Sequence, residues 1–189
     1  KSLIDACPIK LWENSKKQHN DYEYVYTSSR KEMNVCSIVP VSRSYFKLHE
    51  MIVDFHLLND KIYCACLAEG PGGFIHCLND YSYINHSVIH KLYGITLYSS
   101  DKRIPYWNQS IIRNKKNIIS YGQDGTGDLY QLDNVKYFIN QIGNNLCHLV
   151  TADGGFDYSE DYNQQEISSY KLLFSEIYIA LHIQKLDGN

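Results

Sequence analysis

Residues 61–74, KIYCACLAEGPGGF, decide the fold class of this chain. Residues 62–68 are apolar at both odd and even positions, which is typical of a strand buried on both faces of a parallel sheet. A helical pattern begins in GGFIHCLNDY, residues 72–81, directly after the glycines. The stretch therefore predicts a strand, a tight turn and a helix, the repeating unit of an α/β fold.

The glycine turn is also a candidate cofactor site. A dinucleotide fingerprint beginning at Gly70 would need glycine where Ile75 stands, and no Gly-Lys-Ser/Thr follows as in a phosphate-binding loop. The carboxylate of Glu69 suits a cationic ligand, and S-adenosylmethionine carries a sulfonium and an ammonium group. The alternative is a tight connection that binds nothing. The expected cofactor contacts of this turn are Glu69, Gly70, Pro71, Gly72, Gly73 and Phe74.

Helices and strands alternate along the rest of the chain. Leu48, Ile52, Phe55 and Leu58 recur at helical spacing in residues 42–58. Further strands are predicted at 92–99, 117–122 and 146–153, and a helix at 135–143 with Asn134 as its N-cap. A final helix is predicted from Asn163, with an apolar stripe formed by Ile167, Tyr170, Phe174, Ile177 and Leu181. These patterns predict a Rossmann-like α/β fold with a mostly parallel sheet and helices on both faces.

The first 40 residues lack this pattern. Residues 1–40 are predicted to be an N-terminal extension, with Trp12 as its one large apolar anchor, and residues 41–189 the domain itself. The chain lacks a starting Met, and a turn signal at 187–189 follows the last predicted helix. We therefore expect the domain to be cut after its fourth strand and the helix that follows. A missing C-terminal half or a partner would then cover the apolar edge of the sheet.

Composition narrows the class of protein. The chain has 44% hydrophobic and 21% charged residues, as globular proteins do, and no uninterrupted apolar run long enough to span a membrane. Its formal charge of −3 argues against a broad positive field for nucleic acid but allows a local RNA groove. The six cysteines form no CxxC pair and cluster with no histidines, so we expect reduced thiols, a cytoplasmic location and no metal site.

Three loops follow predicted strands and are rich in glycine and acidic residues: 69–74, 122–128 and 153–157. Ligands of open parallel sheets bind beyond the carboxyl ends of the strands, so the three loops are expected to form one site. The second predicted strand ends in Leu97-Tyr98-Ser99-Ser100, with Asp101 one residue later, so Ser99 and Asp101 are candidate cofactor contacts at this edge of the sheet. Asp124 is a loop residue that we place near the cofactor.

Several segments in order resemble the FtsJ-like RNA 2′-O-methyltransferases, and cap methyltransferases of large cytoplasmic DNA viruses such as African swine fever virus in particular. LAEGPGGF resembles the family's first cofactor motif, and SRSYFKLHEM, residues 42–51, its helix with the first catalytic lysine, here Lys47. GQDGTGDLYQLDN resembles a viral loop whose aspartate, here Asp128, meets the adenine. TADGGFDYSEDYNQQE resembles a segment of cap enzymes whose first aspartate, here Asp153, is the second catalytic residue and also lies at the cofactor.

The resemblance implies S-adenosylmethionine as cofactor, capped mRNA as partner, and an enzyme acting in the host cytoplasm or in the virion if it is viral. A ribose 2′-hydroxyl is a weak nucleophile that needs a positioned base or a neighbouring charge, which the family supplies with a Lys-Asp-Lys-Glu tetrad. Its last two members would follow residue 189 and are absent from this sequence. Ribosomal or transfer RNA is the alternative substrate, and an inactive scaffold or RNA-binding subunit the alternative function. The glycine spacing disfavours a nicotinamide-dependent oxidoreductase.

Overall fold

The computed structural model describes residues 6–20, 22–27, 31–58, 62–84, 89–155 and 165–189. Contacts between Cα atoms divide the chain into two units, Lys1–Val39 and Pro40–Asn189. The first unit contains helix α2 (Ile9–Gln18) and a short 3-10 helix (Lys31–Met33). In this unit Trp12 remains 40% exposed, with Lys16 Nζ 5.8 Å from its ring centroid.

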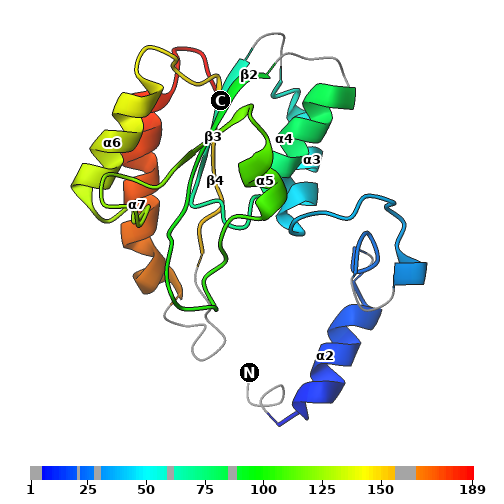
Figure 1. Ribbon diagram of the computed structural model, residues 1–189. Helices are drawn as coiled ribbons and strands as arrows, with labels where there is room; N and C mark the ends of the chain where they lie inside the picture. Colours follow the sequence, from blue (N-terminus) through cyan, green and yellow to red (C-terminus); the bar gives the residue numbers. More distant parts are fainter. Residues whose placement is uncertain (1–5, 21, 28–30, 59–61, 85–88, 156–164) are drawn as a thin grey trace. The chain divides into compact units, whose positions relative to one another are not determined.

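The second unit is a four-stranded parallel sheet with helices on both faces, which confirms the predicted fold class. Its elements are α3 (Ser44–Phe55), β1 (Ile62–Leu67), α4 (Gly73–Ile84), β2 (Ile89–Ile95), α5 (Gln109–Arg113), β3 (Asn117–Ser120), α6 (Leu132–Ile142), β4 (Leu149–Ala152) and α7 (Gln165–Ile183). The strands lie in the order β3-β2-β1-β4. Figure 1 shows α3, α4 and α5 on one face of the sheet and α6 and α7 on the other.

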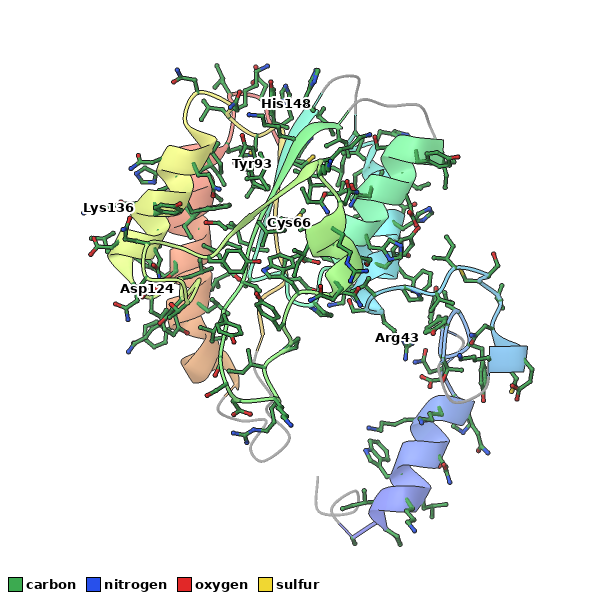
Figure 2. All side chains as sticks on the ribbon, viewed as in Figure 1. Arg43, Cys66, Tyr93, Asp124, Lys136 and His148 are labelled. Carbon is green, nitrogen blue, oxygen red and sulfur yellow. The ribbon has the colours of Figure 1, made fainter. Side chains whose placement is uncertain are left out.

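β1 is a central strand, and its composition follows from that position. It pairs with β2 on one side and β4 on the other, and Cys64, Ala65, Cys66 and Leu67 have no exposed surface. Figure 2 shows Cys66 on the sheet of the second unit, between the helices that cover its two faces. All six cysteines lie in the described residues and are free thiols. Burial raises the pKa of Cys77 and Cys147 to about 12, so these thiols stay protonated and unreactive at neutral pH.

Several boundaries differ from the prediction: β3 and β4 are shorter than the predicted 117–122 and 146–153, and α6 begins three residues before the predicted 135. The second strand runs from Ile89 to Ile95, earlier than the predicted 92–99, because Thr96 turns away to bond the Gly70 amide. The helix predicted over 42–58 ends at Phe55, where His56 takes a left-handed conformation with φ 52°. Phe55 is therefore 70% exposed, whereas Leu48 and Ile52 are buried as predicted.

The apolar stripe predicted for the final helix was wrong. Tyr170, Phe174, Ile177 and Leu181 are exposed, and Ile179 and Ile183 of α7 are buried instead. The predicted start at Asn163 lies outside the described residues, as does the side chain of Ile167. The helix carries apolar residues on two faces, so periodicity alone could not select the face that meets the sheet.

Residues after α7 pair with β4. Cys147 N–H donates to Ile183 O at 2.7 Å, Asn189 N–H to His148 O at 2.8 Å, and Val150 N–H to Asn189 O at 2.8 Å. Residues 183–189 thus bond to the backbone of residues 147, 148 and 150. In the described part of the chain no helix is both long and apolar enough to cross a bilayer.

Candidate active site

A cavity of about 720 Å³ lies at the carboxyl ends of the strands, where the three acidic, glycine-rich loops were predicted to meet. Its volume is in the range of small-molecule sites. Three carboxylates from three different loops line it, which gives it an acidic wall suited to a cationic ligand. The lining residues are Ala68, Gly70, Thr96, Leu97, Asp101, Arg103, Ile104, Pro105, Gly127, Asp128, Leu129, Tyr130, Asp153, Gly154, Gly155 and Leu172.

The glycine turn reaches this cavity through Gly70 alone. Gly70 N–H donates to Thr96 Oγ1 at 2.9 Å, which joins the turn to the end of β2. A Cβ atom at Gly70 would clash with Pro105 O, and one at Gly73 would clash with the hydroxyl groups of Ser42 and Ser44. These two glycines are therefore required by close approach of the protein's own atoms. Four predicted contacts of the turn are not among the lining residues: Pro71, Gly72, Gly73 and Phe74.

Glu69 is buried behind the turn and does not line the cavity. Its side chain is 4% exposed, and its Oε1 accepts the Phe74 N–H at 2.6 Å, in the first turn of α4. Burial raises the pKa of this carboxyl to about 8, and the nearby Asp153 adds to the increase. The structure thus places Glu69 at the start of a helix, where an acceptor satisfies an otherwise free N–H group.

Lys47 and Asp153 come together from α3 and the end of β4. Lys47 Nζ donates to both carboxylate oxygens of Asp153, each at 2.9 Å, although the two residues are 106 positions apart. The side chains are 62% and 33% exposed. The ion pair is therefore open to a substrate arriving from solvent, while Asp153 also faces the cavity.

Asn134 holds the 122–128 loop together, so its predicted role as a helix cap was wrong. The residue preceding α6 is Gln131, and Asn134 lies inside the helix with no exposed surface. Its Oδ1 accepts the Asp124 N–H at 3.1 Å, and its Nδ2 donates to Thr126 Oγ1 at 3.2 Å and to Asp128 O at 3.1 Å. The Asn134 side chain therefore bonds to the 122–128 loop and not to the N-terminal backbone of α6.

The two aspartates of this loop are used differently. Asp124 Oδ1 accepts the backbone N–H and the hydroxyl of Thr126, which lowers the pKa of Asp124, and this residue does not line the cavity. Figure 2 shows Asp124 on the loop before α6. Asp128 lines the cavity, and its Oδ1 accepts the Tyr130 N–H at 2.9 Å.

We expect Asn134→Ala to lower the free energy of unfolding by about 2–3 kcal/mol, because three hydrogen bonds of a buried side chain are lost. Urea denaturation measures this loss. Asn140→Ala, an exposed asparagine of the same helix, is the matched control and should change stability by less than about 0.5 kcal/mol. Equal effects of the two substitutions would show that Asn134 does not support the loop.

At the end of β2, Asp101 lines the cavity and Ser99 does not. Ser99 Oγ accepts the Asp101 N–H at 3.1 Å, so the serine orients the aspartate. Arg103, which also lines the cavity, forms an ion pair with Asp101 at 2.6 Å and lowers the pKa of that carboxyl to about 2. Asp101 is consequently an anion at neutral pH.

Sequence reasoning missed Thr96, Arg103 and Glu176. Glu176 of α7 is 6% exposed and lies against Gly154, next to Asp153. Its spacing of three and seven residues from Ile179 and Ile183, which are buried on α7, is the signal that could have placed it on the inner face. The described residues contain no cluster of three or more His, Cys, Asp or Glu side chains that could hold a metal ion.

Comparison with known proteins gives one family. A family model described as FtsJ-like methyltransferase matches residues 40–189. Human cap-specific mRNA (nucleoside-2′-O-)-methyltransferase 1 is 26% identical over 213 residues, covering 100% of this chain and 24% of the relative.

Two viral relatives are similar over most of this chain. The cap-specific mRNA (nucleoside-2′-O-)-methyltransferase of Autographa californica nuclear polyhedrosis virus is 29% identical, covering 78% of this chain and 53% of the relative. A probable methyltransferase of African swine fever virus is 28% identical, covering 79% and 38%. The chain thus spans only part of each relative, about a quarter of the human one. The match over residues 40–189 shows that the chain belongs to the FtsJ-like methyltransferase family, as its motifs predicted.

Proposed function

We propose that this domain binds S-adenosylmethionine and transfers its methyl group to a ribose 2′-hydroxyl of RNA, at the nucleotide next to the cap of an mRNA. The observation that carries the proposal is the Lys47–Asp153 ion pair at the rim of the acidic cavity. The cap specificity is supported by the human and baculovirus relatives, which are cap-specific enzymes. The site of action would be the cytoplasm.

The cavity suits S-adenosylmethionine in charge and size. When bound, this cofactor supplies an electrophilic methyl group on a sulfonium ion. Asp101, Asp128 and Asp153 place carboxylates on the wall of the cavity, which favours a ligand with two positive groups. A Cβ atom at Gly155 would meet nothing within 4 Å, so this part of the wall is open to a ligand. Gly70, Asp101, Asp128 and Asp153 are the predicted contacts that can hold the cofactor directly.

The remaining predicted contacts act behind this wall. Glu69, with Pro71, Gly72, Gly73 and Phe74, forms the turn that places Gly70. Ser99 orients Asp101, and Asp124 braces the loop of Asp128. We therefore propose that these residues do not contact the cofactor themselves but hold in place the residues that face the cavity.

Lys47 is proposed to act on the 2′-hydroxyl. In the transfer the hydroxyl oxygen forms a bond to the methyl carbon, the carbon–sulfur bond breaks, and the hydroxyl proton leaves to a base or to water. Lys47 would accept this proton in its neutral form or stabilise the developing alkoxide in its charged form. Asp153 fixes the Lys47 amine from two oxygens at once, so the amine is held at the cavity rim before the RNA arrives.

The test is methyl transfer from radiolabelled S-adenosylmethionine to capped RNA by the full-length protein. We expect label in RNA that carries a free 2′-hydroxyl at the first nucleotide and none in the matched 2′-deoxy RNA. Uncapped RNA, transfer RNA and ribosomal RNA serve as competing substrates. Preference for one of these would replace the cap assignment.

Calorimetry with S-adenosylmethionine separates the two functional classes. Binding to the folded full-length protein without transfer to any RNA would support the scaffold alternative. The absence of binding to a folded protein would refute the enzyme.

A further inference from the structure

His148 and Lys185 lie together at the amino-terminal end of the sheet, and the proposed transfer uses neither of them. His148 directly precedes β4, and Lys185 follows the end of α7. The Nζ atom of Lys185 lies 3.2 Å from Nε2 of His148. Figure 2 shows His148 at the end of the second unit away from Asp124. The cavity at the carboxyl ends of the strands is lined by neither His148 nor Lys185, so the pair is separate from the candidate active site.

The backbone of β1 determines which nitrogen of the His148 ring carries the proton. The Tyr63 N–H donates to His148 Nδ1 at 3.2 Å, so Nδ1 must be unprotonated. Burial and the nearby charge of Lys185 lower the pKa of His148, which favours a neutral ring at neutral pH. A neutral imidazole has a single N–H group. In His148 that group is therefore at Nε2, on the side of Lys185.

His148 Nε2–H and the Lys185 ammonium group are consequently two donors only 3.2 Å apart. An ammonium group has no acceptor, so neither member of the pair can satisfy the other. Moving the ring proton to Nδ1 would only transfer the conflict to the Tyr63 N–H. The part of the chain that the structure describes supplies no oxygen acceptor to either donor. The pair therefore requires an acceptor from outside these residues.

Backbone hydrogen bonds hold both residues in place independently of their side chains. The His148 N–H donates to Tyr63 O at 2.8 Å, and His148 O accepts the Asn189 N–H at 2.8 Å. The Lys185 N–H donates to Cys147 O at 2.8 Å. The rings of Tyr63 and His148 are stacked, with 6.2 Å between their centroids and 14° between their planes. The fold thus brings the two donors together although they do not attract each other.

We propose that His148 Nε2–H and the Lys185 ammonium group bind a phosphate group, whose oxygens accept from both donors at once. A phosphate offers several acceptor oxygens and a negative charge, and lysine binds phosphate as a point charge. The RNA backbone and a free nucleotide share this chemistry, and RNA titration distinguishes them. The assignment to RNA rests on the proposed function, whereas the phosphate site itself does not.

Titration of the full-length protein with inorganic phosphate tests the site without reference to activity. In nitrogen-15 spectra of the histidine rings we expect a saturable shift of His148 Nε2. The pKa of His148 should also rise, because a bound anion favours the charged ring. Lys185→Ala should weaken phosphate binding about tenfold, the effect of one lost charged hydrogen bond. Lys136→Ala, at an exposed lysine of α6, is the matched control and should leave phosphate binding unchanged.

Chloride and acetate at the same ionic strength are the control anions. A His148 ring that does not respond to phosphate, or that responds equally to chloride, would overturn the inference. A preference for acetate would overturn it as well, because the site would then recognise a carboxylate of a protein partner.

RNA binding at several salt concentrations identifies the source of the phosphate. For the RNA backbone, Lys185→Ala should lower the affinity severalfold and reduce the slope of log K against log salt concentration by roughly 0.7, the contribution of one contact to a single strand. An unchanged slope, together with a His148 response to phosphate, would assign the site to a free nucleotide.

Failures of the site and of the proposed function remain distinguishable. If the wild-type protein transfers no methyl group to RNA, the proposed function fails. The phosphate titration of His148 still decides whether the site exists.

Discussion

Replacing Lys47 with alanine is expected to lower kcat for 2′-O-methyl transfer by about 10²–10⁴-fold, which corresponds to about 3–5 kcal/mol of transition-state stabilisation. The Lys47 side chain lies at the cavity rim and donates to both oxygens of the Asp153 carboxylate. Its loss removes the group that would accept the hydroxyl proton or stabilise the alkoxide.

Binding of S-adenosylmethionine should survive this substitution. Lys47 is not among the residues that line the cavity, and removing its charge leaves Asp153 free to attract a cation. We therefore expect a Kd equal to that of the wild type or lower, measured by calorimetry. A rate loss that appears only as weaker cofactor binding would contradict the role of Lys47 at the hydroxyl group.

Lys136→Ala is the matched control for Lys47→Ala. Lys136 is an exposed lysine of α6, the helix on the other face of the sheet (Figure 2). Its substitution should leave kcat within about twofold of the wild type. Undiminished activity in Lys47→Ala would remove Lys47 from the site altogether.

Replacing Glu69 with glutamine is expected to flatten the dependence of stability on pH. In the unfolded chain a glutamate loses its proton near pH 4.5, whereas the folded protein keeps the Glu69 proton up to about pH 8. Between these values the folded state binds more protons, so the contribution of Glu69 to the free energy of unfolding falls as the pH rises. The full shift corresponds to at most roughly 5 kcal/mol.

Urea denaturation at several pH values measures the effect. Glutamine keeps an oxygen that can accept the Phe74 N–H, and any cost of its buried NH₂ group is the same at every pH. The slope of stability against pH is therefore the quantity to compare.

The interval from pH 7 to 8 is the most informative, because the Glu176 carboxyl, with its pKa of about 7, contributes mainly below it. Glu50→Gln, an exposed carboxylate of α3, is the control and should leave the slope as it is in the wild type. Parallel slopes for Glu69→Gln and the wild type would show that Glu69 is ionised in the folded protein at neutral pH.

The order of the elements was predictable from short local patterns. Each pattern lies within a few neighbouring residues: the apolar run of β1, the glycine turn, and the helical spacing of apolar residues in α3 and α4. The alternation of strands and helices could therefore be derived from the sequence. The motifs around Lys47, Asp128 and Asp153 likewise identified a family that the comparison with known proteins confirmed.

Features that depend on distant partners were not predictable. The local pattern suggested that Asn134 caps α6, but its amide group bonds to a loop six to ten residues earlier. Glu69 was expected to face a cationic ligand because it adjoins the glycines, yet the path of the turn buries it against the start of α4. The apolar residues of α7 occupy two faces, and the packing against the sheet selected the one with Ile179 and Ile183.

The sequence by itself determined the class of fold, the family, and the three loops that supply the candidate site, because each is encoded within a few consecutive residues. Tertiary structure alone decided which members of those loops face the cavity, that Lys47 and Asp153 meet across 106 positions, and that Glu176 lies beneath the turn of Asp153. These outcomes depend on how helices pack on the sheet and how burial shifts the pKa of a carboxyl group. No local pattern contains that information.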